Sequence, residues 1–101
     1  MAKLVVIHGD IPQREFVLGD DVIVGRALES DVVIPGPFCS RRHARMTLSD
    51  GAWCIEDLGS ANGTVVNGRT IGRIELHDGD WVTLGDCQLT FVLDDDYVPP
   101  Q

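Results

Sequence analysis

Residues 44–58 read ARMTLSDGAWCIEDL, and this stretch decides the fold class. Apolar and polar side chains alternate along residues 44–48 and again along residues 52–58, which is the period-two pattern of a half-buried strand. The tripeptide Ser49-Asp50-Gly51 between the two runs is rich in turn formers. The stretch therefore predicts two antiparallel strands joined as a hairpin.

The same pattern recurs along the rest of the chain, and no segment supports a helix of three turns. Short apolar or alternating runs are separated by turn residues every 8–12 positions, which is typical of an antiparallel sandwich or barrel. We predict hairpins at Gly19-Asp20 and at Asn67-Gly68, and Gly85-Asp86 is expected to lead into the last strand. The further strands are expected at residues 4–7, 14–18, 21–25, 32–34, 64–66, 69–71, 81–84 and 87–93. The fold class is thus all-β.

Length and charge limit the function classes. A chain of 101 residues and 11.0 kDa makes one domain, which we place at residues 1–93, followed by an acidic, proline-ended tail or linker at 94–101. The 8 basic and 16 acidic side chains give a net charge of −8, which argues against nucleic-acid and anionic-membrane partners. The apolar run at the start is too short for a signal peptide, so we expect a cytoplasmic chain.

Cysteine and histidine usage predicts no disulfide framework and no metal or other cofactor. The three cysteines are odd in number and form no CxxC pair, and the three histidines lack metal-ligand spacing. Cys54 and Cys87 lie in strand-like runs and are expected to be small core residues. In the run that holds Cys54, Trp53 and Ile55 are expected to face one side of the sheet.

Three loops carry more hydrogen-bonding chemistry than a turn requires. They hold Gly25-Arg26, then Ser40-Arg41-Arg42-His43, then residues 59–64 followed by Asn67-Gly68. Loops at one end of a sandwich cluster into a binding surface. Arginine, a serine hydroxyl and loop amides can together hold a tetrahedral dianion, and an asparagine amide can bond both backbone groups of an extended peptide.

The order of these motifs resembles the forkhead-associated (FHA) domain family, whose pattern is G-R, S-x-x-H, N-G-T and N-G. All four parts are present in that order, and the resemblance runs from about residue 22 to residue 91. It implies an eleven-stranded sandwich of the FHA/SMAD-like type. It also implies that loops at one end bind a phosphothreonine protein or peptide made by an upstream Ser/Thr kinase.

The resemblance also implies roles for single residues. Arg26 would grip the phosphate with both guanidinium nitrogens, Ser40 would donate its hydroxyl, and Arg41 would contribute its backbone amide. Asn62 would clamp the peptide backbone near the phosphothreonine, and Asn67 would touch the peptide beyond it.

The remaining motif residues would shape the site. His43 would brace the loop that holds the serine, and the other shaping positions are Gly25, Gly63, Thr64 and Gly68. Ala61 departs from the family pattern, which often has threonine there. One phosphate donor is thereby lost, at a cost of roughly a kcal/mol, unless Ser60 replaces it.

Three other readings compete with phosphopeptide binding. A scaffold or assembly domain of the same fold would bind its partner without phosphate, and Ala61 favours this alternative. An enzyme would need an activated nucleophile or a metal cluster, yet no acidic residue is evident to orient His43 beside Ser40. DNA binding is disfavoured by the charge and by the lack of a recognition helix.

Overall fold

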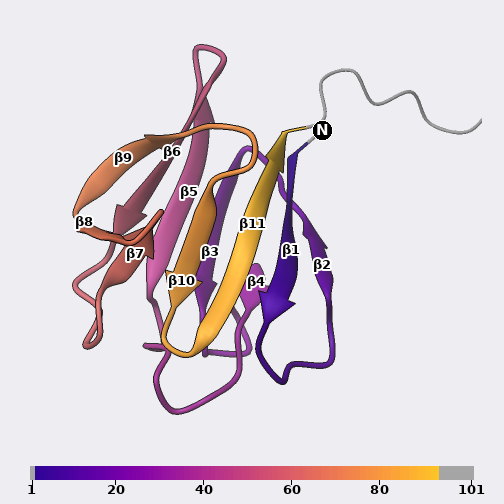
Figure 1. The fold of residues 1–101 in the computed structure, drawn as a ribbon, viewed down its shortest axis with the longest axis vertical. Helices are drawn as coiled ribbons and strands as arrows, with labels where there is room; N and C mark the ends of the chain where they lie inside the picture. Colours follow the sequence, from indigo (N-terminus) through magenta and orange to yellow (C-terminus); the bar gives the residue numbers. More distant parts are fainter. Residues whose placement is uncertain (1, 94–101) are drawn as a thin grey trace, which may run out of the picture.

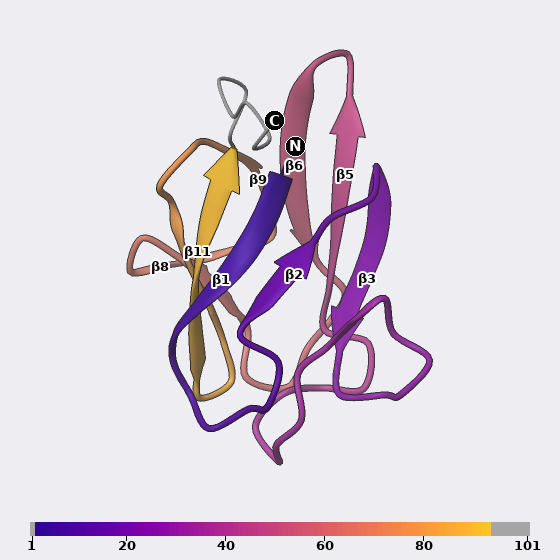
Figure 2. The same cartoon turned by 90° about the vertical axis from the view of Figure 1, so that its right-hand side faces the viewer.

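The computed structural model describes residues 2–93 as two β-sheets packed face to face, so the expected all-β sandwich is confirmed (Figure 1, Figure 2). No helix long and apolar enough to cross a membrane occurs within these residues. The strands of the described part are β1 (Ala2–His8), β2 (Glu15–Val17), β3 (Asp21–Gly25), β4 (Val32–Val33), β5 (Ala44–Ser49), β6 (Ala52–Asp57), β7 (Thr64–Val66), β8 (Arg69–Ile71), β9 (Arg73–Leu76), β10 (Trp81–Leu84) and β11 (Cys87–Leu93). The tail predicted at 94–101 lies outside the described residues.

The six-stranded sheet has the order β2-β1-β11-β10-β7-β8, and the five-stranded sheet has the order β4-β3-β5-β6-β9. Strand pairing is antiparallel with one exception, because β4 runs parallel to β3 and pairs Val32 with Val24. The loop 26–31 carries the chain back along β3 before β4 begins. The backbone N–H of Asp31 donates to the carbonyl of Ile23, and the Asp31 carboxylate accepts from the backbone N–H of Ile23. A purely antiparallel sandwich was therefore too simple an expectation.

Two of the predicted turns form hairpins as expected, and one does not. Asp50 and Asn67 adopt φ values of 52° and 50° in the β5–β6 and β7–β8 turns, which is the left-handed backbone that such two-residue turns require. Gly19-Asp20 instead leads from one sheet to the other, so that hairpin prediction is wrong. β2 pairs with β1 and β3 pairs with β5, because each finds a longer partner strand elsewhere.

The core lies between the two sheets and follows the alternation of the strands. Trp53 and Ile55 are buried, and Trp53 makes an edge-to-face ring contact with Phe91 from the opposite sheet. Cys87 is buried as predicted. Cys54 is only half-buried, so its assignment to the core is wrong, since the period of two turns it away from its buried neighbours.

One end of the sandwich gathers the loops that matter for the site. The loops after β3, β4 and β6 and the β10–β11 turn all lie at the lower end in Figure 1, whereas the β5–β6 hairpin lies at the upper end. The sheets thus act as a rigid frame that brings together segments far apart in the sequence.

Candidate functional site

The loop after β3 and the loop after β4 lie so close together that their backbones are in contact. Gly25 is buried at the end of β3, and a Cβ atom built on it would lie 2.1 Å from the carbonyl oxygen of Arg41. The backbone N–H of the next residue, Arg26, donates to the carbonyl of Ser40 over 2.9 Å. Glycine is required here because no side chain fits between the two loops.

The loop that carries Ser40 also orients the Arg26 side chain. Its Nε donates to the carbonyl of Cys39 over 3.1 Å, which holds the guanidinium against the loop that carries Ser40. The two terminal nitrogens form no hydrogen bond or ion pair within residues 2–93. They are the pair of donors that a bidentate contact with an oxyanion needs.

Ser40 links this loop to the one after β6. Its Oγ accepts a hydrogen bond of 2.9 Å from the backbone N–H of Ala61. Because that bond uses an oxygen lone pair, the hydroxyl proton is left to be donated. The backbone N–H of Arg41 also has no acceptor in the described part of the chain. The structure therefore brings the predicted residues Arg26, Ser40 and Arg41 to one place, beside the loop of Asn62.

His43 is fully buried and joins the same two loops from beneath. The backbone N–H of Ser40 donates to its Nδ1 over 3.0 Å, so the ring proton lies on Nε2. That Nε2–H donates to the carbonyl of Gly63 over 2.8 Å. The imidazole is thus neutral with both nitrogens engaged, which suits a structural brace and leaves no nitrogen for a metal ion or a catalytic proton.

Asp57 organises the loop after β6, and the motif reasoning gave it no role. Its carboxylate accepts from the backbone N–H groups of Gly59 and Ser60, from the Ser60 hydroxyl and from the buried Thr64 hydroxyl. Burial of this carboxyl tends to raise its pKa, but the four hydrogen bonds outweigh burial and lower the pKa below the ordinary value of 3.8. An aspartate two residues before a glycine is an Asx-turn signal that sequence analysis could have used.

Hydrogen bonds within the site also determine which donors and acceptors of Ser60 and Asn62 remain available to a ligand. The Ser60 hydroxyl is committed to Asp57, so it does not stand in for the donor absent at Ala61. The Asn62 amide nitrogen donates to the carbonyl of Phe38 over 2.8 Å, which leaves its oxygen and its second N–H available.

Asn67 lies apart from this cluster, at the other end of β7. Its side chain donates to Asp80 over 3.0 Å and accepts from the backbone N–H of Trp81 over 2.8 Å. A strand of three residues is about 10 Å long, so β7 separates Asn67 from the loop that ends at Gly63. The contacts of Asn67 are those of a turn residue that fixes the β7–β8 hairpin to β10.

The arginines differ in their availability. Arg41 makes an exposed ion pair of 3.4 Å with Glu29, and Arg42 has no partner in the region that the structure describes. Arg45 is engaged by both oxygens of Asp21, at 2.8 and 2.6 Å, on the outer face of the five-stranded sheet. The positive charge near the cluster is therefore carried by residues 26, 41 and 42.

Taken together, this arrangement presents hydrogen-bond donors and positive charge rather than a reacting group. Within residues 2–93 no group of three or more His, Cys, Asp or Glu side chains is arranged to hold a metal ion. Free guanidinium N–H groups, a hydroxyl and an unpaired backbone amide on loops that are hydrogen-bonded to one another are the chemistry of an anion-binding site.

Comparison with known proteins gives the same fold and family. Over 92 residues the chain is 36% identical to the glycogen accumulation regulator GarA of Mycolicibacterium smegmatis. The aligned region covers 90% of this chain and 58% of that protein. Over 70 residues it is 46% identical to the ABC transporter ATP-binding/permease protein Rv1747 of Mycobacterium tuberculosis, covering 69% of this chain and 8% of that protein. The chain thus spans only part of the length of these relatives.

Among solved structures, the FHA domain of CT664 from Chlamydia trachomatis is 34% identical, with a TM-score of 0.81, over 96% of this chain and 98% of that one. The FhaA FHA domain, solved in complex with the intracellular domain of Rv3910, is 28% identical with a TM-score of 0.82, over 90% of this chain and 99% of that one. The FHA domain family model matches residues 22–85. Since that match covers more than half of the chain and contains every loop of the cluster, this protein belongs to the FHA domain family.

Proposed function

We propose that this domain binds phosphothreonine-containing segments of partner proteins in Ser/Thr kinase signalling. The observation that carries the proposal is the hydrogen-bonded junction of three loops, in which Arg26 contacts the Ser40 loop and Ser40 contacts Ala61. Similar proteins support it, since phosphothreonine-dependent interactions were studied in a solved FHA domain of the same fold and EmbR of Mycobacterium tuberculosis was solved with a phosphopeptide.

The free donors match the acceptors of a phosphate monoester. The phosphate carries about −1.5 to −2 charges at neutral pH and three strongly accepting oxygens. In our proposal the terminal nitrogens of Arg26 take two of these bonds, the Ser40 hydroxyl takes one, and the backbone N–H of Arg41 completes the set. Each charge-assisted bond contributes roughly 1.5–3 kcal/mol net.

Asn62 would hold the peptide rather than the phosphate. Its bond to the Phe38 carbonyl fixes the amide plane and leaves the Oδ1 acceptor and one N–H donor. Those two groups can bond the N–H and the C=O of an extended peptide, which is how a clamp without sequence preference works. We also propose that Asn67 keeps its role in the hairpin while the nearby turn borders the peptide path.

The partner would be a cytoplasmic protein phosphorylated by a Ser/Thr kinase. The partner in the FhaA complex is described as an intracellular domain, which supports this location. Binding, not catalysis, is the proposed activity, because both ring nitrogens of His43 are engaged and no other side chain among residues 2–93 that could act as a general base is hydrogen-bonded to the Ser40 hydroxyl.

The test is calorimetry with a phosphothreonine peptide library and with the unphosphorylated form of each peptide that binds. Arg26→Ala should weaken binding by at least about 10-fold, since two charge-assisted bonds are lost. Arg45→Ala is the matched control, because Arg45 is an exposed arginine paired with Asp21 on another face. It should bind as the parent protein does.

Two outcomes would contradict the proposal. Equal binding by Arg26→Ala and the parent would remove the phosphate site from this place. Equal affinity for the phosphorylated and unphosphorylated peptides would favour the scaffold alternative instead.

A further inference from the structure

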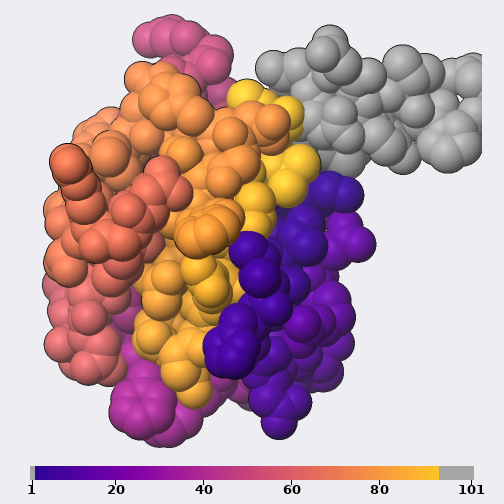
Figure 3. Space-filling view, viewed as in Figure 1, coloured from indigo at the N-terminus to yellow at the C-terminus, as the bar shows by residue number. Residues whose placement is uncertain are grey.

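Phe38 is an exposed aromatic residue at the end of the sandwich that holds the candidate site. It is 54% exposed and lies in the loop after β4, two positions before Ser40. In Figure 3 the magenta atoms of this part of the chain project at the lower end of the molecule, where Figure 1 shows the loops of the site. Aromatic side chains are enriched in binding surfaces, and the proposed function gives this ring no task.

The backbone of Phe38 is fixed by its neighbours. Its carbonyl accepts the hydrogen bond of 2.8 Å from the Asn62 amide. The β10–β11 turn packs against it so closely that a Cβ built on Gly85 would lie 2.6 Å from the Phe38 carbonyl carbon. Pro37, the preceding residue, has a fixed φ and so stiffens the chain that leads into Phe38. A ring on a backbone that is already ordered loses little freedom on binding, which favours its use in recognition.

The contact with Asn62 places Phe38 beside the proposed path of the peptide. In the proposed function the Asn62 amide bonds the peptide backbone through its oxygen and one N–H, while its other N–H holds the Phe38 carbonyl. A hydrogen-bonded peptide group lies about 3 Å from the amide. Only one side chain therefore separates the peptide from the backbone of Phe38, and side chains of the peptide come within reach of the ring.

The surroundings of the ring favour an apolar ligand side chain over a charged one. Residues 35–38 carry no ionisable side chain. The Arg41 guanidinium is paired with Glu29 of the loop after β3. The Asp86 carboxylate lies 3.6 Å from a Cβ built on Gly36, so an acidic ligand side chain on this side would be repelled. An apolar side chain gains from contact with the ring and brings no charge that needs a partner.

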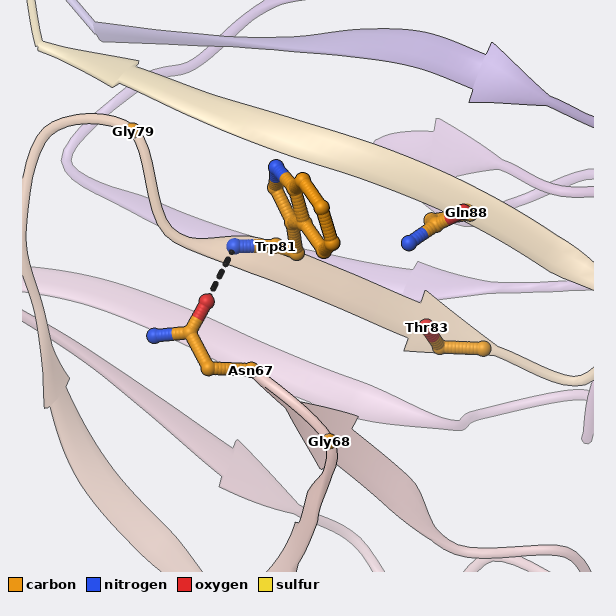
Figure 4. Close-up of a pocket in the computed structure, with 6 residues that line it drawn as sticks. All are labelled: Asn67, Gly68, Gly79, Trp81, Thr83 and Gln88. Atoms are coloured by element: carbon orange, nitrogen blue, oxygen red, sulfur yellow. Dashed lines mark hydrogen bonds between the residues drawn. The ribbon is translucent and has the colours of Figure 1, made fainter.

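Trp81 is a second aromatic residue with 54% exposure, but it lies away from the peptide clamp. Figure 4 shows it beside a hollow of about 670 Å³ on the six-stranded sheet, with Asn67 on the other side. Its backbone N–H is bonded to Asn67 and not to Asn62. Trp81 begins β10, whereas Gly85 follows the end of that strand, so about 14 Å of extended chain separates Trp81 from the turn that contacts Phe38. Phe38 is the better placed of the two rings.

We propose that Phe38 selects among phosphothreonine segments by packing its ring against an apolar side chain that neighbours the phosphothreonine. The inference rests on the proposed function, because it needs the peptide backbone to lie along Asn62. It adds the chemical class of the partner segment, whose neighbouring side chain is one such as leucine or isoleucine and not an acidic or basic one. Phosphate and clamp together fix the register of the peptide, and successive side chains of an extended peptide point to opposite sides. The preference should therefore be strongest at one peptide position.

Fluorescence anisotropy with labelled phosphothreonine peptides tests this inference on the 101-residue chain. The peptides are identical except at one position, which carries leucine, serine, glutamate or lysine, and that position is moved along the peptide from one set to the next. At one position the leucine peptide should bind at least about 5-fold more tightly than the serine peptide, as expected for one apolar contact. The glutamate and lysine peptides should bind no more tightly than the serine peptide there.

Variants assign the preference to the ring. Phe38→Ala should reduce the leucine-to-serine ratio to below about 2-fold and leave the affinity for the serine peptide unchanged, which also shows that the variant folds. Phe38→Leu should keep part of the preference, because an apolar side chain remains. Val17→Ala is the matched control, because Val17 is 67% exposed but lies on β2 at the edge of the six-stranded sheet, and it should keep the full ratio.

Three outcomes would overturn the inference. The first is equal affinity for the leucine and serine peptides at every position. The second is a preference for glutamate or lysine, which would assign selection to the charged residues of the loops. The third is a leucine preference that Phe38→Ala keeps and Trp81→Ala removes, which would assign selection to the hollow beside Trp81.

The failure of this inference can be told apart from the failure of the proposed function. Phosphopeptides that lose affinity with Arg26→Ala but show no leucine preference would leave the phosphate site in place and remove only the role of Phe38. Peptides that bind equally with and without phosphate would overturn both.

Discussion

His43 is a fully buried imidazole whose two ring nitrogens hold two loops together. It follows Ser40 and Arg41, two of the residues that offer donors to the candidate site, yet it presents nothing to solvent itself. Its effect on binding is therefore indirect, through the positions of the Ser40 amide and the Gly63 carbonyl.

We predict that His43→Ala destabilises the domain by about 2–5 kcal/mol. It leaves the Ser40 N–H and the Gly63 carbonyl without their partner and opens a cavity in a fully buried place. Urea unfolding of the variant measures this loss, with His8→Ala as the exposed-histidine control. A change below about 0.5 kcal/mol, the size typical of surface substitutions, would contradict the bracing role.

Asp57 predicts a pH dependence with a definite sign. Its pKa is lowered in the folded state, so its stabilising contribution is complete above the ordinary value of 3.8 and is lost as the pH falls through the lower folded pKa. Asp57→Asn should remove about 1–3 kcal/mol at neutral pH and flatten the loss of stability in acid. Thermal unfolding of the parent protein and of Asp57→Asn, from neutral pH down to acid, measures the difference in stability. The same dependence of stability on pH in both proteins would contradict the prediction.

At the scale of elements, the end of β3 and the loop before β5 are in backbone contact. We predict that Gly25→Ala is severely destabilising, because its new Cβ would lie 2.1 Å from the Arg41 carbonyl oxygen and the backbone would have to move. Gly72→Ala is the matched control, since nothing lies within 4 Å of a Cβ there and its φ needs no glycine. Thermal unfolding should separate the two variants, and equal melting temperatures would refute the close approach.

The same scale shows why local signals mislead at two places. Gly19-Asp20 reads like a hairpin turn, but a turn sequence does not say whether its flanking strands pair with each other. β9 was missed as a separate strand because only Leu76 of its four residues is buried, so the alternating pattern is absent. β9 forms because its backbone pairs with that of β6, and the sequence of β9 alone does not predict this pairing.

For the whole molecule, an acidic body carries a local cluster of arginines. Salt screens the attraction between exposed charges, with a Debye length of about 8 Å at physiological ionic strength, and the arginines of the cluster are the charges that would attract the phosphate. We predict that phosphopeptide affinity falls as salt rises above that level, and that Arg26→Ala shows a shallower slope. Calorimetry over a salt series measures both slopes, and identical slopes would count against the arginine contact.

Binding should also weaken below about pH 6, where the phosphate regains its second proton and loses charge. Fluorescence anisotropy of a labelled phosphothreonine peptide across the range measures the effect. Constant affinity down to about pH 5 would show that the charge of the dianion is not what the site reads.

The sequence alone determined the strands with clear alternation, the Asn67-Gly68 and Asp50-Gly51 turns, and the residue types of an anion site at Arg26, Ser40 and Asn62. These depend on neighbours in the chain, through backbone conformation and the burial period of a strand.

The tertiary structure decided which strands share a sheet, that Arg45 is paired with Asp21, and that Ser60 is bound by Asp57. It also decided that the hydroxyl of Ser40 meets the amide of Ala61, 21 positions away. Contacts of that range form only when the sheets pack, because no local preference of the backbone specifies a partner so distant in the chain.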